Sequence, residues 1–267
     1  MSLTGKTKAS SYKDILQMNN SNSGVDTNTR IVVDGEGTES VIAISDDVCV
    51  IRPKNDDTVA CFSVRDKDNN ALLSVDTTNS VVKAGVNQDV VNTQYAHFGV
   101  INNNSGSSGF SSGTHHPLVF NGHMLADAGN PPSFGTGTDP GTTFTTAEAN
   151  ATRASDIVSM LWRVPDNITI DEIKHIEGSD TATGDTTRMH LMSYTFNSGA
   201  TGCLADGTVI ANTSADNTNA GSEQPYLKDW SIGTADVDAG KVLLCMFRSD
   251  SINSDYSVSV TIKYHLR

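Results

Sequence analysis

Short apolar runs separated by polar turns fill the first third of the chain, from Gly24 to Asn92. Within most runs the apolar side chains recur at every second position, which is the period of a half-buried β-strand. A new run begins about every ten residues. Because each run is so short, we predict a weak repeat of thin strands that does not form a self-sufficient sandwich. The runs are RIVVDG, VIAIS, VCVIRP, VACFSV, ALLSVD and SVVKAGV.

The segment Ala71 to Gly85, ALLSVDTTNSVVKAG, shows the difficulty that such thin strands raise. It predicts a strand, a turn and a second strand, yet an isolated two-stranded hairpin is marginally stable in water. The neighbouring runs are equally thin, so the missing cover comes most economically from identical copies of the chain. We therefore expect Leu73, Val75 and Val81 to face a trimer axis or a neighbouring subunit.

The pattern changes between residues 96 and 154, where Gly, Ser, Asn, Thr and Pro dominate. This composition is typical of loops and hairpins, and tight turns are expected at Asn121-Gly122 and at Asp139-Pro140-Gly141. Large apolar residues such as Phe110 and Phe134 are too frequent for a fully solvated linker. The sequence thus favours ordered loops over a free low-complexity segment.

Longer strands are predicted from residue 155 to residue 267. The clearest is the last, because every second residue from Tyr256 to Leu266 is apolar and fits a strand on a buried sheet face. Polar turns separate the runs at the spacing of an antiparallel β-sandwich. The runs are DIVSMLWRV, ITIDEIKHIEG, TTRMHLMSYTF, GTVIANTS, QPYLKDWSIG, KVLLCMFRS and YSVSVTIKYHL.

The strongest helix signal lies near the N-terminus, at Ser11 to Met18. Ser11 with Asp14 fits a capping box, and Tyr12, Ile15 and Leu16 share one face. So short a helix is not stable alone. We expect it to dock, either on its own chain and its copies or on a larger assembly.

The chain has 267 residues and a formal net charge of -13, with Lys and Arg scattered singly. An acidic surface without a basic patch repels phosphate backbones and anionic headgroups, so neither nucleic acid nor a membrane is expected as a partner. The first twenty residues lack the apolar core of a secretory signal, so synthesis in a cytoplasm is expected. In that reducing setting Cys49, Cys61, Cys203 and Cys245 are interpreted as buried free thiols.

Few residues carry a pattern typical of chemistry. No zinc spacing, nucleophile elbow or clustered catalytic triad is visible, so we expect no enzymatic activity and no cofactor. The group His115, His116 and His123 is interpreted as surface-loop histidines; ligation of a metal at a three-fold axis and contact with a receptor are the alternatives. Asp66 to Ala71 begins like a calcium loop but lacks its glycine and glutamate, which indicates an acidic turn.

Two segments together resemble a known class of protein. TGKTKASSYKDILQMNNSNSGVDTNTRIVVDGEGTESVIAISDDVCVIRP and FSVRDKDNNALLSVDTTNSVVKAG are similar to the N-terminal and stalk portions of fibre or appendage proteins in the virions of tailed bacteriophages, in particular marine phages. The resemblance covers about the first ninety residues. It implies a homotrimer with an N-terminal anchor, a slender β stalk and a C-terminal head, and no catalytic residue carries over.

Together these patterns predict an all-β chain with a short N-terminal helix, a slender trimeric β stalk and an antiparallel, jelly-roll-like β-sandwich head. The expected parts are an attachment segment (1–20), the stalk (21–95), a loop-rich region (96–154) and the head (155–267). The function expected is host-surface adhesion from the virion surface, with another virion protein of the tail, neck or capsid as docking partner and a host glycan or protein as receptor. The head loops at His115, His116 and His123 and at Asn217 to Glu223 are the candidate contacts. A capsid decoration protein, a carbohydrate-binding module and a carbohydrate-active enzyme remain alternatives.

Overall fold

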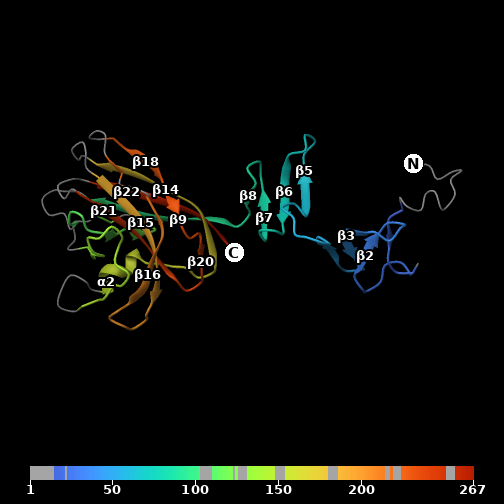
Figure 1. Ribbon diagram of the computed structural model, residues 1–267, viewed down its shortest axis with the longest axis horizontal. Coiled ribbons are helices and arrows are strands. Elements are labelled where there is room, and N and C mark those ends of the chain that lie inside the picture. Colours follow the sequence, from blue (N-terminus) through green and yellow to red (C-terminus); the bar gives the residue numbers. More distant parts are fainter. Residues whose placement is uncertain are drawn as a thin grey trace. The chain divides into compact units, whose positions relative to one another are not determined.

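The chain is built almost entirely from β-strands, as its computed structural model shows (Figure 1). It divides into two compact units, Met1–Val91 and Asn92–Arg267. All but one of the strand pairs in the described part are antiparallel, so the all-β expectation is confirmed. The structure describes residues 15–21, 23–102, 110–122, 124–125, 131–147, 154–179, 186–213, 217–218, 224–250 and 256–267.

Unit 1 contains two four-stranded antiparallel meanders, each with its strands in chain order (Figure 1). The first consists of β1 (Gln17–Met18), β2 (Arg30–Val33), β3 (Glu39–Ile44) and β4 (Cys49–Ile51). The second consists of β5 (Phe62–Arg65), β6 (Ala71–Asp76), β7 (Val81–Ala84) and β8 (Asp89–Val90).

The two meanders are copies of one structural repeat. Strands β5, β6 and β7 begin 32 residues after β2, β3 and β4, respectively. The pairings obey the same offset, since Ala43 lies opposite Val50 and Val75 lies opposite Val82. The sequence suggested a recurrence about every ten residues, whereas the repeat is a three-strand unit.

One turn in each repeat is closed by the same four hydrogen bonds. The Asp34 carboxylate accepts the backbone N–H of Glu36 and of Thr38, at 2.9 and 2.8 Å, and two backbone bonds join residues 34 and 38 and residues 37 and 34. Asp66 does the same 32 residues later. A residue with positive φ completes both turns, Gly37 in the first and Asn69 in the second. The Asp66 segment is therefore an acidic turn, as predicted.

The predicted N-terminal helix is absent from the part of Ser11 to Met18 that the structure describes. Tyr12 lies outside the described residues, Ile15 and Leu16 are irregular, and Gln17–Met18 form β1. Met18 pairs with Val32, so strand pairing overrides the local helical pattern. Ile15 and Leu16 are 41% and 71% exposed, and their docking on a particle stays a prediction.

Unit 2 consists of two seven-stranded sheets, named here after a central strand. The β9 sheet contains β9 (Thr93–Asn102), β11 (Val119–Phe120), β12 (Met124–Leu125), β14 (Ile168–Ser179), β18 (Tyr226–Asp229), β20 (Asp236–Val237) and β22 (Tyr256–Leu266), with the main order β11-β9-β22-β14-β18. The β15 sheet contains β10 (His116–Pro117), β13 (Trp162–Arg163), β15 (Thr186–Phe196), β16 (Leu204–Asn212), β17 (Asn217–Thr218), β19 (Ser231–Ile232) and β21 (Val242–Ser249), with the main order β10-β21-β15-β16-β19.

The inner faces of these two sheets share one hydrophobic core. Phe98 and Val260 enter it from the β9 sheet, and Leu191 and Cys245 enter it from the β15 sheet. Along β22 the alternate residues from Tyr256 to Ile262 are at most 2% exposed, as the period-2 pattern predicts. The β-sandwich character expected for this part of the chain is confirmed.

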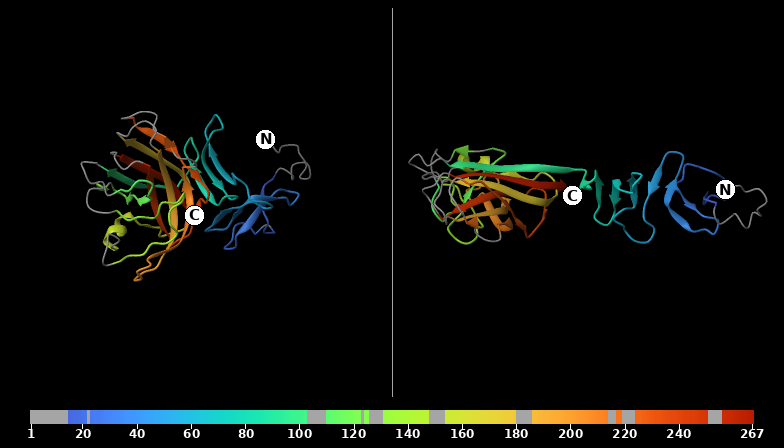
Figure 2. Two further views of the ribbon diagram at one scale, coloured as in Figure 1. Left: turned by 60° about the vertical axis from the view of Figure 1, so that its left-hand side comes forward. Right: turned by 90° about the horizontal axis from the view of Figure 1, so that it is seen from above.

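Two predictions for this unit are wrong. The start of the predicted loop-rich region 96–154 is wrong, because residues 96–102 belong to β9, which pairs along its whole length with β22 (Figure 2). The described residues that follow, up to 147, are mostly turns and irregular segments with the two-residue strands β10, β11 and β12. The run DIVSMLWRV is not one strand, because it begins within helix α2 (Ala154–Ile157), continues as the 3-10 turn η2 (Val158–Met160) and ends in β13. Ile157, Met160 and Trp162 are all buried. A short apolar run is compatible with either a buried helix or a buried strand, so the pattern alone did not distinguish them.

The outer face of the β15 sheet is covered by its own chain. A second hydrophobic cluster forms there, in which Phe134, Phe144 and Met160 pack on Tyr194 and Met246. The Tyr194 hydroxyl donates to the Gly141 carbonyl at 2.6 Å and ties the covering segment to the sheet. Burial raises the pKa of this phenol well above its usual range.

Candidate functional site

The β5–β8 sheet carries apolar side chains on one side, and these form the candidate site. In an antiparallel ladder, residues directly opposite one another point to the same face of the sheet. Phe62 lies opposite Val75, Val64 opposite Leu73, and Leu73 and Val75 lie opposite Ala84 and Val82. We call this set the apolar face: Phe62, Val64, Leu73, Val75, Val82 and Ala84.

The apolar face is half exposed. Phe62, Val64 and Val82 are 37%, 43% and 40% exposed, and the other three members are partly exposed. Burying a large apolar side chain completely contributes about 1.5–3 kcal/mol, and this face has gained only part of that. An incompletely covered sheet face of this kind is typical of a surface that packs against another protein.

The sequence placed Val81 on this face together with Leu73 and Val75, and that assignment is wrong for Val81. Val81 lies opposite Asp76, so it points to the other side with Ser74 and Lys83. The neighbouring Val82 takes its place. The signal was available in the turn, since Thr77 to Ser80 fix the β6–β7 register and a one-residue slip exchanges the two faces.

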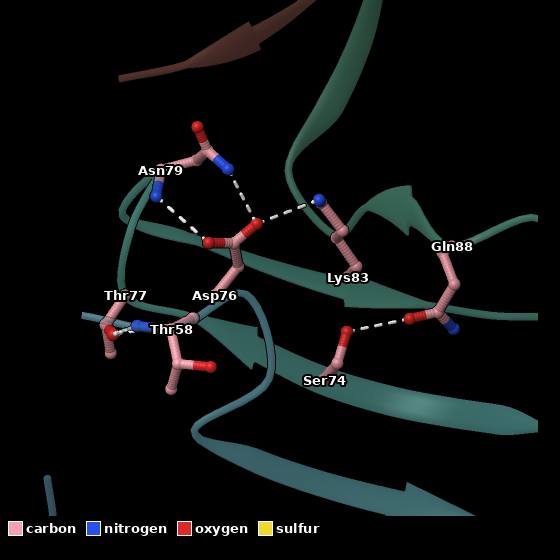
Figure 3. Close-up of polar contacts among 7 residues, drawn as sticks. All are labelled: Thr58, Ser74, Asp76, Thr77, Asn79, Lys83 and Gln88. Atoms are coloured by element: carbon pink, nitrogen blue, oxygen red, sulfur yellow. Dashed lines mark hydrogen bonds and ion pairs between the residues drawn. The ribbon is translucent and has the colours of Figure 1, made fainter. Parts of the chain in front are cut away.

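The other side of the β5–β8 sheet is closed by polar contacts (Figure 3). Asp76 is 1% exposed, and its carboxylate accepts the Asn79 side-chain amide at 2.8 Å, the Asn79 backbone N–H at 3.0 Å and the Lys83 ammonium at 3.0 Å. These contacts, with the Asn79 amide first, lower the pKa of Asp76 to about 2. Ser80, at a positive φ of 57°, completes the turn that Asp76 holds.

Two further contacts cover this polar side. The Gln88 side-chain oxygen accepts a hydrogen bond from the Ser74 hydroxyl at 2.7 Å (Figure 3). Its side-chain nitrogen donates to the Ala71 carbonyl at 2.8 Å. Thr58 lies next to Thr77, whose hydroxyl accepts the Thr58 backbone N–H at 3.0 Å. As a result Ser74 is only 5% exposed.

The two sides of this sheet therefore differ in what covers them. On one side Ser74 and Asp76 are buried under polar contacts within unit 1, although Leu72 on the same side is 44% exposed. On the other side the apolar face is half exposed and is the larger continuous set of apolar side chains on the sheet.

The histidines in the predicted receptor loop are not on the surface. His115 and His116 are 0% and 3% exposed, so the interpretation as surface-loop histidines is wrong for both. His123 lies outside the described residues. His116 accepts the Ser111 backbone N–H and contacts the Pro132 carbonyl at 3.0 Å, beneath the segment that covers the β15 sheet.

His190 of β15 completes this buried group, and sequence reasoning missed it. Its ring lies 4.9 Å from the ring of His115, edge to face, and its Nε2 lies 3.3 Å from Asp139. Burial lowers the pKa of all three histidines, and that of His190 falls to about 4. Among the residues described, no three His, Cys, Asp or Glu side chains come together as a metal site.

The remaining predicted features are scattered. Asn217 is in β17, and residues 219 to 223 of the other candidate loop lie outside the described part. All four cysteines are free, but only Cys203 and Cys245 are buried, whereas Cys49 is exposed and Cys61 partly exposed. No helix in the described ranges is long and apolar enough to span a membrane.

Comparison with known proteins gives no family. No family model matches the chain, and no curated protein matches it either. Two solved structures are weakly similar: Eiger TNF from S. frugiperda, at 13% identity over 66% of this chain and 94% of that one with a TM-score of 0.26, and infectious bursal disease virus Gx strain, at 9% identity over 73% and 72% with a TM-score of 0.18. At these TM-scores neither likeness bears on function.

Proposed function

We propose that the chain is a non-enzymatic structural protein of a tailed-bacteriophage virion, a homotrimeric fibre or appendage. Residues near 1–20 attach it to another virion protein, unit 1 forms a slender trimeric stalk, and unit 2 is a jelly-roll-like head at the virion surface. The chain is made in the host cytoplasm and assembled onto the tail, neck or capsid. Its head presents a surface for adhesion to a host glycan or protein.

The observation that supports this proposal most is the half-exposed apolar face of the β5–β8 sheet. Strands of two to six residues cannot bury that face against one another, because all six side chains lie on the same side. Copies of the same chain related by a symmetry axis supply the cover without any further component. A trimer also presents three heads together, so a low affinity at each head suffices for firm attachment.

The oligomer is tested by the mass of the full chain in solution at micromolar concentration. We expect three times the mass of the 28.3 kDa chain. A stable monomer would overturn the trimeric stalk.

The position on the virion is tested by labelling the chain on intact particles and imaging them. Label confined to the tail or neck is expected for a fibre. Label at many equivalent sites over the capsid would overturn adhesion and indicate a capsid decoration protein.

A further inference from the structure

The two sheets of unit 2 differ in how their outer faces are covered. The β15 sheet is covered by its own chain, through Phe134, Phe144 and Met160. On the β9 sheet, large apolar side chains remain exposed on the outer side. Tyr95, Ile101, Ile176 and Leu227 are 58%, 41%, 54% and 65% exposed.

Cross-strand pairing shows that these exposed side chains belong to one surface. Leu227 lies opposite Ile176, Ile176 opposite Ser259, and Ser259 opposite Gly99 on β9, which places all of them on the same side of the sheet. Tyr95 and Ile101 lie on that side too, two residues or a multiple of two away from Gly99. We call this surface the open face: Tyr95, His97, Gly99, Ile101, Glu172, Lys174, Ile176, Leu227, Asp229, Ser257, Ser259, Thr261 and Lys263.

The open face is hollowed between its apolar side chains. A depression of about 230 Å³ is lined by Tyr95, Ile176 and Leu227 together with the smaller side chains of Ser259 and Thr261. Apolar side chains around a shallow depression can receive protruding side chains from an opposing surface.

The charges on the open face are balanced, in contrast to the rest of the molecule. Lys174 and Lys263 share the face with Glu172 and Asp229, although the chain as a whole has a net charge of -13. Lys174 contacts Glu172 at 2.5 Å and Asp229 at 3.6 Å. Two copies of so acidic a chain repel each other over most of their surface, but less here, where the positive and negative side chains of the face offset one another.

Chain continuity points to the same partner. Strand β9, which bears Tyr95 and Ile101, begins at Thr93, and β8 of the stalk sheet ends at Val90. Three residues span at most about 11 Å, so copies that associate through the apolar face bring their β9 strands into close reach. A tether that short gives the heads a high effective concentration for one another.

We propose that the open face is a second self-association surface, whose partner is the open face or adjoining surface of another copy of this chain. This inference rests on the proposed function, in which unit 1 already holds the copies together. It assigns Leu227, Ile176 and Tyr95 to subunit contacts in the head. The heads of the three subunits would then contact one another through the open face and would not move as independent units.

The experiment compares full-length variants by the concentration at which half of the chains are assembled. Leu227→Asp places a charge within the proposed contact, on its most exposed large apolar side chain. Val158→Asp is the matched control, because Val158 is 64% exposed in unit 2 but lies on η2, which is not one of the strands that form the open face. Leu227→Asp should raise the half-assembly concentration at least about tenfold, and Val158→Asp should leave it within about twofold of wild type.

The stalk variant Val82→Asp and the double variant Val82→Asp/Leu227→Asp separate the two proposals. If both surfaces act, each single variant weakens assembly and the double variant abolishes it. If Leu227→Asp matches Val158→Asp while Val82→Asp still dissociates the oligomer, the head contact is overturned and the proposed trimer stands. If the wild type is a monomer, both are overturned. Binding of wild type to a printed glycan array that Leu227→Asp alone removes, with unchanged mass, would assign the open face to a saccharide.

Discussion

Val82 offers the sharpest test of the apolar face, because its contribution to assembly can be worked out from its exposure. Val82→Ala removes two methyl groups, which contribute about 1.6 kcal/mol when fully buried. Val82 is 40% exposed within its own chain, so about 0.6 kcal/mol of that is gained only when a partner covers it. The rest, about 1 kcal/mol, belongs to the folding of unit 1 itself.

A trimer contains three such side chains, so Val82→Ala should weaken assembly by about 2 kcal/mol, or about 25-fold in the trimer association constant. Because that constant scales with the square of the chain concentration, the half-assembly concentration should rise about fivefold. Val82→Asp should go much further, since each subunit would bury an unpaired carboxylate.

Sedimentation equilibrium over a dilution series measures this shift directly. Val86→Ala is the matched control, because it removes the same two methyl groups from a residue that does not belong to the apolar face. Val86 lies in the turn after β7 and is 88% exposed. An equal midpoint for Val82→Ala and Val86→Ala would refute the assignment of Val82 to a subunit contact. An intact trimer in Val82→Asp would refute that assignment as well.

The other predictions concern the folding of each unit. Asp76→Asn should speed amide hydrogen exchange across the β6–β7 hairpin at neutral pH, whereas Asp68→Asn, in an exposed turn, should not. In the wild type the hairpin should lose stability as the pH falls from about 4 toward 2, since the Asp76 carboxylate stabilises it only while it is ionised. Unit 2 should lose stability as the pH falls from 6.5 to about 4, because in this range the unfolded state binds protons at histidines that stay neutral when buried in the folded state. The melting temperature should therefore decrease less with falling pH in His190→Gln than in the wild type; an equal decrease would contradict this role of His190. Gly207→Ala should cost about 1–3 kcal/mol, because a Cβ there would lie 2.9 Å from the backbone of Thr142, and calorimetry should find Gly233→Ala, with its nearest neighbour at 3.8 Å, close to wild type.

The long strands of unit 2 could be predicted residue by residue. The runs TTRMHLMSYTF and YSVSVTIKYHL coincide with β15 and β22, because each is long and turn residues bound it. Trp162 and Trp230, which the core of a sandwich favours, are 5% and 8% exposed. Where one face of a strand is buried along its whole length, the local pattern and the tertiary structure agree.

Two of the failures share a physical cause, which is that partners distant in sequence decided the outcome. Met18 extends a sheet because Val32 is available to pair with it, although its neighbours favour a helix. His115 and His116 are buried because a segment near Pro132 folds over them. Neither partner is visible in a local pattern. By contrast, the exchange of Val81 for Val82 was a local error of one residue in strand register.

The repeat missed in the sequence did leave a trace. Asp34 and Asp66 are identical 32 residues apart, as are Val32 and Val64, Asn55 and Asn87, and Asp57 and Asp89. Few other positions match, so strand and turn geometry is retained while side chains diverge. A search for recurring turn patterns, rather than for identical residues, would have found the repeat. The pattern is an aspartate followed three positions later by a residue that tolerates positive φ.

The repeat makes unit 1 modular. Each three-strand repeat closes its own turn with its own aspartate, so an in-frame gain or loss of one repeat leaves the hydrogen bonding inside the neighbouring repeat unchanged. In the stalk proposed above, evolution would then change the length of the chain in whole repeats of 32 residues.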